Sequence, residues 1–275
     1  MTRTSTPRPR QHRPAAAPPA PVTDLDGMLR RLHLPTVRRL YSELATRAEA
    51  EGMSYHTYLE TLIAEEIAHR AETRLTRAVR KARFPFLRTI DDFNFTFQTA
   101  LKLQMLGSYL GPELVTEGKN ALFSGPSGTG KSHLCIAIAY RAIQHGYDAR
   151  FVGADELIGE LSRAASKGRL TAALAPYLHP HVLIIDELGY LSHAADAANV
   201  RYRVINERYL QRRPLLLTTN KPLAALGDVL HDGDLAEAIL DRLLERGVHF
   251  ALRGRSYRTK HLPEEDAPPR RAKAS

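Results

Sequence analysis

One stretch decides the fold of this chain: Gly125-Pro126-Ser127-Gly128-Thr129-Gly130-Lys131-Ser132. The apolar run 121–123 precedes it and predicts a strand, and the apolar run 134–139 follows it and predicts a buried helix. A phosphate-binding loop requires this order of strand, loop and helix. The stretch therefore predicts both a phosphate-bearing ligand and an α/β core.

The residue types of the loop suit ATP and Mg²⁺. Gly125, Gly128 and Gly130 let the backbone curl so that its N–H groups converge on phosphate oxygens. Lys131 is expected to reach the β- and γ-phosphates, and Ser132 is expected to ligate Mg²⁺. The helix N-terminus adds partial positive charge. A flexible Gly/Ser loop that matches by chance is the alternative, and the flanking segments argue against it.

A second motif ends another apolar run, where Val182-Leu183-Ile184-Ile185 leads into Asp186-Glu187. A buried strand that ends in two acids is the Walker B pattern. Asp186 is expected to hold Mg²⁺ directly or through water, and Glu187 to act as the general base that polarises the attacking water. The alternative is an acidic strand end in a turn.

A third motif is Pro214-Leu215-Leu216-Leu217-Thr218-Thr219-Asn220, an apolar run that ends in polar residues. Asn220 or Thr219 is expected to hydrogen-bond the γ-phosphate or the lytic water, as at the sensor 1 position of AAA+ ATPases. An ordinary transition from strand to turn is the alternative.

The fourth motif is Leu240-Asp241-Arg242-Leu243 on a late helix. Arg242 is a candidate arginine finger, which stabilises charge in the transition state of a neighbouring subunit's phosphoryl transfer. Hydrolysis would then need an oligomer. The alternative is a surface ion pair of Arg242 with Glu245 or Asp241.

Short apolar runs alternate with helical stretches from residue 119 to 258, which predicts a doubly wound parallel sheet of the α/β class. The expected strands are 120–124, 148–152, 181–186, 214–219 and 247–251, and the expected helices are 131–145, 154–165, 196–211 and 234–246.

Composition divides the chain into five parts. The first and last, 1–22 and 260–275, are basic and Pro/Ala-rich or polar, and we expect both to be disordered tails. Residues 24–82 read as a helical domain that binds DNA or a partner, and 83–118 read as a connector with one helix from Leu101 to Gly111. Residues 119–259 form the expected ATPase domain.

Basic charge is a further signal, because the formal net charge is +9 and the isoelectric point is near 9.8. Such charge favours nucleic-acid binding, although it also serves solubility. Arg70, Arg74, Arg77 and Lys81 form a stripe at helical spacing. The stripe either follows a phosphate backbone or is a solvated face that pairs with Glu66 and Glu72.

Other classes of function receive no support from the composition. No apolar run is long enough to cross a membrane, and the N-terminus lacks a secretion signal. The single cysteine, Cys135, fits a reducing cytoplasm and is expected to be a buried core residue. The histidines show no compact metal-ligand spacing.

Taken together, these residues resemble the IstB-like family, the helper ATPases of insertion-sequence transposition, which are related to DnaC-type helicase loaders. The resemblance runs from about residue 26 to 259. The motifs that carry it, in chain order, are Phe84-Pro85, Asp91-Asp92-Phe93, 125–134, Ile185-Asp186-Glu187-Leu188-Gly189-Tyr190-Leu191, Ile205-Asn206-Glu207-Arg208-Tyr209, Leu240-Asp241-Arg242-Leu243 and Ser256-Tyr257-Arg258. The phosphate loop alone is generic, whereas the sets that begin at Asp186, Asp241 and Ser256, in this order, are more specific.

The resemblance implies an AAA+ fold with strand order 5-1-4-3-2, an inserted helix within 154–178, and a small all-α region ahead of it. It implies ATP-dependent homo-oligomers on duplex DNA that recruit or regulate a transposase. It adds His133 to the nucleotide-binding residues and makes Asn220 sensor 1 and Arg242 a finger acting in trans. Leu226 stands where the family usually has Trp, and Arg201 and Arg203 replace neutral residues, either for DNA contact or as surface decoration.

Two other functions stay open at this point. A replicative helicase loader would share the same core, and the N-terminal helices would choose the partner. A DNA-binding adaptor would use ATP only as a structural ligand, and the presence of Glu187 argues against it.

Overall fold

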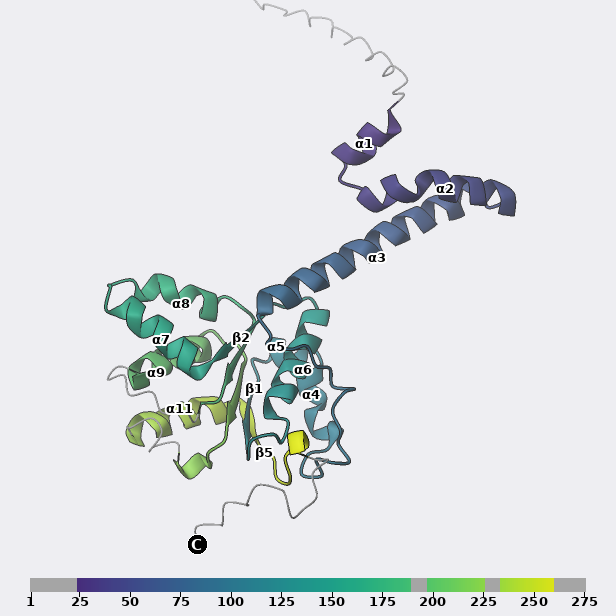
Figure 1. The fold of residues 1–275 in the computed structure, drawn as a ribbon. Coiled ribbons are helices and arrows are strands. Elements are labelled where there is room, and N and C mark those ends of the chain that lie inside the picture. The colour runs from purple at the N-terminus through teal and green to yellow at the C-terminus, as the bar shows by residue number, and fades with distance from the viewer. Residues whose placement is uncertain (1–23, 189–196, 226–232, 260–275) are drawn as a thin grey trace, which may run out of the picture. The chain divides into compact units, whose positions relative to one another are not determined.

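The computed structural model describes residues 24–188, 197–225 and 233–259 (Figure 1). The two tails, the 189–191 part of the Walker B motif and Leu226 lie outside the described residues. Contacts divide the chain between Glu72 and Thr73 into two compact units. No helix among the described residues is long and apolar enough to span a membrane.

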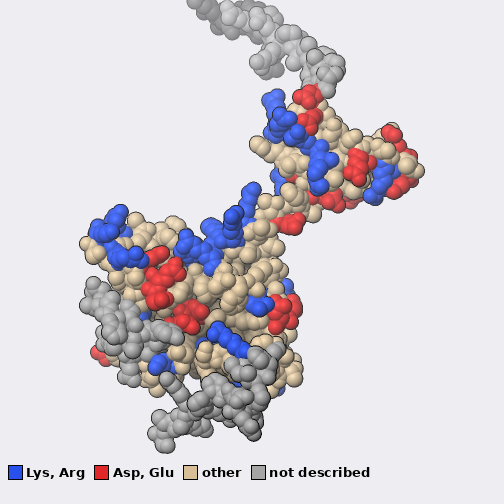
Figure 2. All heavy atoms as spheres, viewed as in Figure 1, with Lys and Arg blue, Asp and Glu red and all other residues tan. Residues whose placement is uncertain are grey.

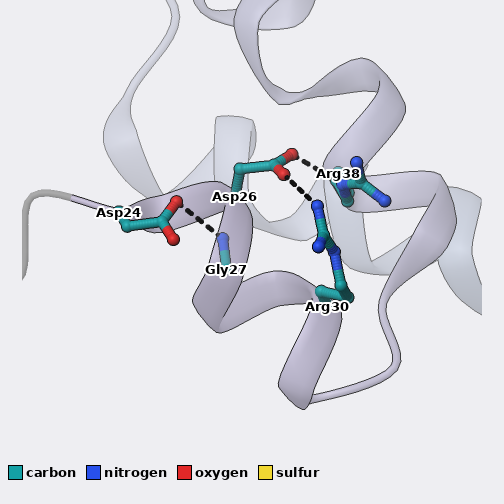
Figure 3. A network of polar contacts seen from close by, with 5 residues as sticks. All are labelled: Asp24, Asp26, Gly27, Arg30 and Arg38. Atoms are coloured by element: carbon teal, nitrogen blue, oxygen red, sulfur yellow. Dashed lines mark hydrogen bonds and ion pairs between the residues drawn. The ribbon is translucent and has the colours of Figure 1, made fainter.

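The first unit is helical, as predicted. It contains α1 (Leu25–Arg31), α2 (Pro35–Glu51) and the first part of α3 (Tyr55–Ala82). Asp24 caps α1, because its Oδ1 accepts a hydrogen bond of 2.8 Å from the Gly27 amide (Figure 3). Asp26 forms an ion pair with Arg30 within α1 at 3.1 Å, and its second ion pair, with Arg38 of α2 at 2.6 Å, joins the two helices (Figure 3).

Glu66 anchors α3 to the start of α2. Leu34 precedes α2 and has no side chain that can cap it, so the carboxylate of Glu66 accepts from the amides of Thr36 at 2.8 Å and Val37 at 3.2 Å. Arg70 holds the same carboxylate at 2.7 Å. Burial alone would raise the pKa of Glu66, but these hydrogen bonds outweigh it and lower the pKa.

The second unit is built on a parallel sheet whose five strands lie in the order β2-β3-β4-β1-β5. This is the predicted order, read from the other edge. Each expected strand is present within a residue of its predicted bounds: β1 (Asn120–Ser124), β2 (Ala149–Gly153), β3 (Val182–Asp186), β4 (Leu215–Thr219) and β5 (Gly247–Ala251).

Side chains alternate between two cores, one on each face of the sheet. Phe123, Ile184 and Leu216 face the first core, which α6 (Lys131–Gln144) covers, and Leu122 and Leu183 face the second. The second core is covered by α7 (Ala154–Ala165), α8 (Leu170–Leu178), α9 (Ala197–Leu210) and α11 (Gly233–Glu245). The insertion expected after β2 is therefore a pair of helices, α7 and α8 (Figure 1).

The segment that precedes β1 packs into the first core. Ile90, Phe93, Leu106 and Leu114 are all buried there, beside the last turns of α3. The helix expected between Leu101 and Gly111 is present as two consecutive short elements, η1 (Leu103–Leu106) and α4 (Gly107–Leu110), and a further short helix that was not expected, α5 (Glu113–Thr116), follows Pro112. Gly107 keeps a helical backbone, and the helical stretch ends at Gly111, where the backbone is extended.

A fully buried arginine on α9, Arg208, joins α8 to the starts of two strands. It donates to carbonyl oxygens in the last turn of α8 and in the segments that directly precede β3 and β4, at 2.7 to 3.0 Å. Burial lowers the pKa of Arg208 to about 9, so it remains charged at neutral pH. Arg201 is also buried, at 2% exposure, which excludes both the DNA contact and the surface position expected for it, whereas Arg203 is exposed.

Candidate nucleotide-binding site

The phosphate loop lies between β1 and α6, as the sequence predicted. Gly128 and Gly130 have φ of 78° and 96°, in the left-handed region that favours glycine. A Cβ on Gly130 would also lie 2.6 Å from the ring of Phe93, and one on Gly128 would clash with Ser256. These two positions require glycine both for backbone conformation and for close packing.

Lys131 opens α6 and is almost entirely buried. Its Nζ donates to the carbonyl oxygens of Gly125 at 2.7 Å and Pro126 at 2.8 Å, which leaves one of its three N–H groups for another acceptor. Burial lowers the pKa of Lys131, and the nearby charges of Asp186 and Glu187 oppose that shift. The amine is therefore held in the loop close to two carboxylates.

Ser132 and Asp186 meet at the end of β3, as the two motifs predicted. The hydroxyl of Ser132 lies 2.7 and 2.9 Å from the two carboxylate oxygens of Asp186. The hydroxyl of Thr218 donates to the same carboxylate at 2.6 Å. The carboxylate is thus fixed between the first residues of α6 and the end of β4.

Thr218 also holds Glu187, and sequence reasoning assigned no role to Thr218. Its Oγ1 accepts the Glu187 amide N–H at 2.8 Å, and Glu187 has φ of 62°, an unusual value for a residue with a side chain. The available signal was a hydroxyl directly after the apolar Leu215–Leu217 run, still within the strand. Because β4 pairs with β3, that hydroxyl falls beside the acidic strand end.

The predicted residues line one cavity of about 190 Å³. Its walls include Ser127, Gly128, Gly130, Lys131, Ser132 and His133 from the loop, together with Glu187 and Asn220. Asn220 and Glu187 are exposed at this cavity, each directly after the end of its strand. Thr219, the alternative to Asn220, is buried and its Oγ1 accepts the Lys221 amide at 3.1 Å.

The chain's C-terminal segment supplies a further wall that sequence reasoning missed. After β5, the Leu252 amide donates to Ser124 O, and the Tyr257 amide donates to Gly128 O, both at 2.8 Å. This brings η3 (Tyr257–Thr259) over the loop, and Arg258 lines the cavity. The positive charge of Arg258 is one reason that the pKa of Lys131 is lowered.

His133 fastens the segment ahead of β1 to the loop. Its Nε2 lies 2.8 Å from the carbonyl oxygen of Thr89, so Nε2 carries the donated proton. Burial lowers the pKa of His133, which keeps the imidazole neutral. His133 therefore contributes structure and a neutral wall beside the phosphate loop.

Arg242 does not line the cavity that contains Lys131 and Glu187 in its own chain. Its Nε donates to Asn206 Oδ1 at 3.1 Å, its Nη1 donates to Ala238 O at 2.9 Å, and its guanidinium lies over the ring of Tyr202. Among the ion pairs of residues 24–188, 197–225 and 233–259, none joins Arg242 to Asp241 or Glu245.

The four residues of the basic stripe on α3 differ in whether they form ion pairs. Arg70 pairs with Glu66, and Lys81 pairs with Asp148 at 3.2 Å. Arg74 and Arg77 are exposed, and no ion pair within the described part of the chain includes them. Lys and Arg gather over the last turns of α3 and near the junction of α7 and α8 (Figure 2).

The strand order, the phosphate loop and the acidic end of β3 define an AAA+ P-loop domain, here preceded by a helical region. The family model for IstB-like ATP binding proteins matches residues 27–264. The chain belongs to this IS21-type family of insertion-sequence ATP-binding proteins.

Relatives in known insertion sequences support this assignment. An ATP-binding protein of insertion sequence IS5376 from Geobacillus stearothermophilus is 37% identical over 237 residues, covering 86% of this chain and 94% of the relative. That of IS21 from Pseudomonas aeruginosa is 32% identical over 237 residues, covering 86% and 89%. The crystal structure of DnaI matches with a TM-score of 0.51 at 19% identity, covering 63% and 93%, and supports the fold alone.

Proposed function

We propose that this ATP-binding protein hydrolyses ATP to ADP and phosphate, assembles on duplex DNA, and regulates or recruits a partner transposase. The observation that carries the proposal is the shared cavity of Lys131, Ser132, Glu187 and Asn220, with Asp186 behind it. A cation, a hydroxyl, a general base and a polar sensor are the groups that phosphoryl transfer to water requires.

The residues at the end of β3 fit Mg²⁺. Hydroxyl and carboxylate oxygens are the ligands that Mg²⁺ prefers, and Ser132 presents its hydroxyl directly to both oxygens of Asp186. Ser132 and Asp186 would hold the ion, which would neutralise phosphate charge when bound. Ser132 would exchange its hydrogen bond with Asp186 for the ion, while Thr218 keeps the carboxylate oriented.

The protein's own groups would divide the remaining work. Backbone N–H groups of the loop and Lys131 would bind the β- and γ-phosphates, and Arg258 would add a second positive charge. Glu187 would accept a proton from the attacking water, and Asn220 would orient that water or the γ-phosphate. Both of these side chains are exposed at the cavity, where water can reach them.

The hydrolysis proposal is tested by measuring phosphate release from ATP with Mg²⁺, with and without duplex DNA. We expect Glu187→Gln to abolish turnover while nucleotide binding persists, because the amide cannot accept the proton. Unchanged turnover in Glu187→Gln, in the presence of DNA, would exclude Glu187 as the base.

Assembly and the trans role of Arg242 are tested together by mixing two variants. Arg242→Ala lacks the finger, and Glu187→Gln lacks the base, so each homo-oligomer should be inactive. A mixed oligomer contains interfaces that pair an intact base with an intact finger, so mixing should restore turnover. Failure to restore turnover, with mixed oligomers shown by light scattering, would argue that Arg242 acts within its own subunit or has a structural role.

DNA binding is supported by the net charge of +9 and by the exposed Arg74 and Arg77. We expect DNA affinity to fall steeply with salt, and the double variant Arg74→Ala/Arg77→Ala to weaken binding and flatten that dependence. Arg47→Ala, an exposed arginine paired with Glu51, is the matched control. A salt dependence equal to that of the wild type would remove this stripe from the DNA interface.

The transposase partner is supported by the relatives, which are described as proteins of insertion sequences. The choice is tested by identifying the genes that flank this one and by co-purifying this protein with a transposase encoded there, in the presence of ATP and DNA. Association with a replicative helicase instead would favour the loader function.

A further inference from the structure

A second cavity, of about 290 Å³, adjoins the phosphate cavity. The two share Arg88, Gly130, His133 and Tyr257 as lining residues, so they form one continuous depression along the phosphate loop. This volume lies near the lower end of the range for small-molecule pockets, roughly 300–1,000 Å³. A ligand whose phosphates occupy the loop can therefore extend into the second cavity.

The walls of this cavity suit a flat aromatic ring. Phe97 and Tyr257 line it and contact each other edge to face, with ring centroids 5.2 Å apart. Phe93 lines it too and packs edge to face against His133 at 5.2 Å. Aromatic side chains offer large apolar faces to a planar partner.

One buried side-chain amide in this wall has only part of its hydrogen-bonding capacity satisfied. Gln98 is 3% exposed and lines the cavity, and its Nε2 donates to Thr129 O at 3.3 Å. A carbonyl oxygen only accepts, so this contact fixes the amide orientation and leaves Oε1 as the group still to be satisfied. Among the described residues, Oε1 has no hydrogen-bond partner.

We propose that Gln98 Oε1 accepts a hydrogen bond from the 6-amino group of adenine and so selects adenine over guanine nucleotides. The proposal rests on the proposed nucleotide-binding function of the loop and names its base specificity. Adenine presents an N–H₂ donor at position 6, whereas guanine presents an acceptor oxygen there. Two acceptors facing each other in a buried site leave both unsatisfied, which rejects guanine.

The test compares ATP with purine riboside 5′-triphosphate, which has the same phosphates and ring but lacks the 6-amino group. Calorimetry with the full chain measures both affinities. We expect ATP to bind about tenfold more tightly, which corresponds to one hydrogen bond to a buried acceptor. In Gln98→Met the two ligands should bind with nearly equal affinity, because the side chain keeps its length and loses its acceptor.

Gln104→Met is the matched control, since Gln104 is exposed and lines neither cavity. It should retain the tenfold preference. Equal binding of the two ligands by the wild type would overturn the inference even if Gln98→Met does not fold, and so would a preference that survives in Gln98→Met. If the wild type binds neither nucleotide, the proposed function is overturned as well. Failure of the base-specificity inference and failure of the proposed function therefore give different results.

Discussion

Thr218→Val is the substitution that most directly tests how this site is held. Valine has nearly the shape of threonine, so packing in the fully buried position is retained and only the hydroxyl is lost. That hydroxyl donates to Asp186 at 2.6 Å and accepts the Glu187 amide at 2.8 Å. No other described residue makes both contacts.

The expected cost follows from these two hydrogen bonds. A hydrogen bond to a charged carboxylate contributes about 2 kcal/mol, and an amide left without an acceptor costs about 1 kcal/mol or more. The positive φ of Glu187 adds strain that the lost contact had offset. We therefore expect the free energy of unfolding of the second unit to fall by about 3 kcal/mol.

Turnover should fall more than nucleotide affinity does. The phosphate loop is untouched, so ATP affinity should change by less than about threefold, whereas a loosened Asp186 and Glu187 should slow phosphate release by at least tenfold, which is about 1.4 kcal/mol in barrier height. Urea unfolding and steady-state turnover measure the two effects. Thr218→Ser keeps the hydroxyl and should behave nearly as the wild type.

The reasoning would be refuted by a Thr218→Val protein that unfolds within 1 kcal/mol of the wild type and turns over ATP at the same rate. A lower free energy of unfolding together with an unchanged turnover rate would limit Thr218 to a structural role.

Three further predictions concern single side chains. Arg258→Ala should weaken ATP binding about tenfold by calorimetry, because it removes one of the cationic groups of the phosphate cavity, and unchanged affinity would place Arg258 outside the phosphate contacts. Arg208→Met should lower the unfolding free energy by about 4 kcal/mol in urea, since four carbonyl oxygens lose a buried donor, and a loss below 1 kcal/mol would contradict this. The pKa of Glu66 is lowered on folding, so its stabilisation is present above pH 4.5 and is lost as the pH falls through the lower, folded value. Glu66→Gln should abolish that loss in acid titrations followed by circular dichroism, and an unchanged acid response would assign it to other carboxylates.

Local patterns were sufficient to predict much of the fold. Strands such as β3 are built on a continuous apolar run, here Val182–Ile185, because both of their faces are covered, and that feature is visible in the sequence. Ser132 and Asp186 were likewise predictable as neighbours, because the loop after one parallel strand and the carboxyl end of another strand of the same sheet meet at one edge of that sheet. Both inferences use short-range patterns and the general geometry of parallel sheets.

Residues whose role depends on distant contacts were not predictable in the same way. Arg208 and Arg201 look like surface arginines in sequence, and only the fold buries them. Gln98 lies in a segment without periodicity. The orientation of its side-chain amide depends on a hydrogen bond to Thr129, which is 31 residues away.

The phosphate loop is braced from both directions along the chain. From the upstream side, Phe93 packs against the loop and Gln98 donates a hydrogen bond to it. From the downstream side, the backbone amides of Leu252 and Tyr257 donate hydrogen bonds to Ser124, just before the loop, and to Gly128 within it. A fragment cut to 119–251 would keep almost every residue of the nucleotide motifs, and yet it would lack all four of these braces. Deleting the segment before residue 119 or the segment after residue 251 would therefore disturb the phosphate loop as an active-site mutation does. The smallest fragment that retains the intact loop must extend from the end of α3 to η3.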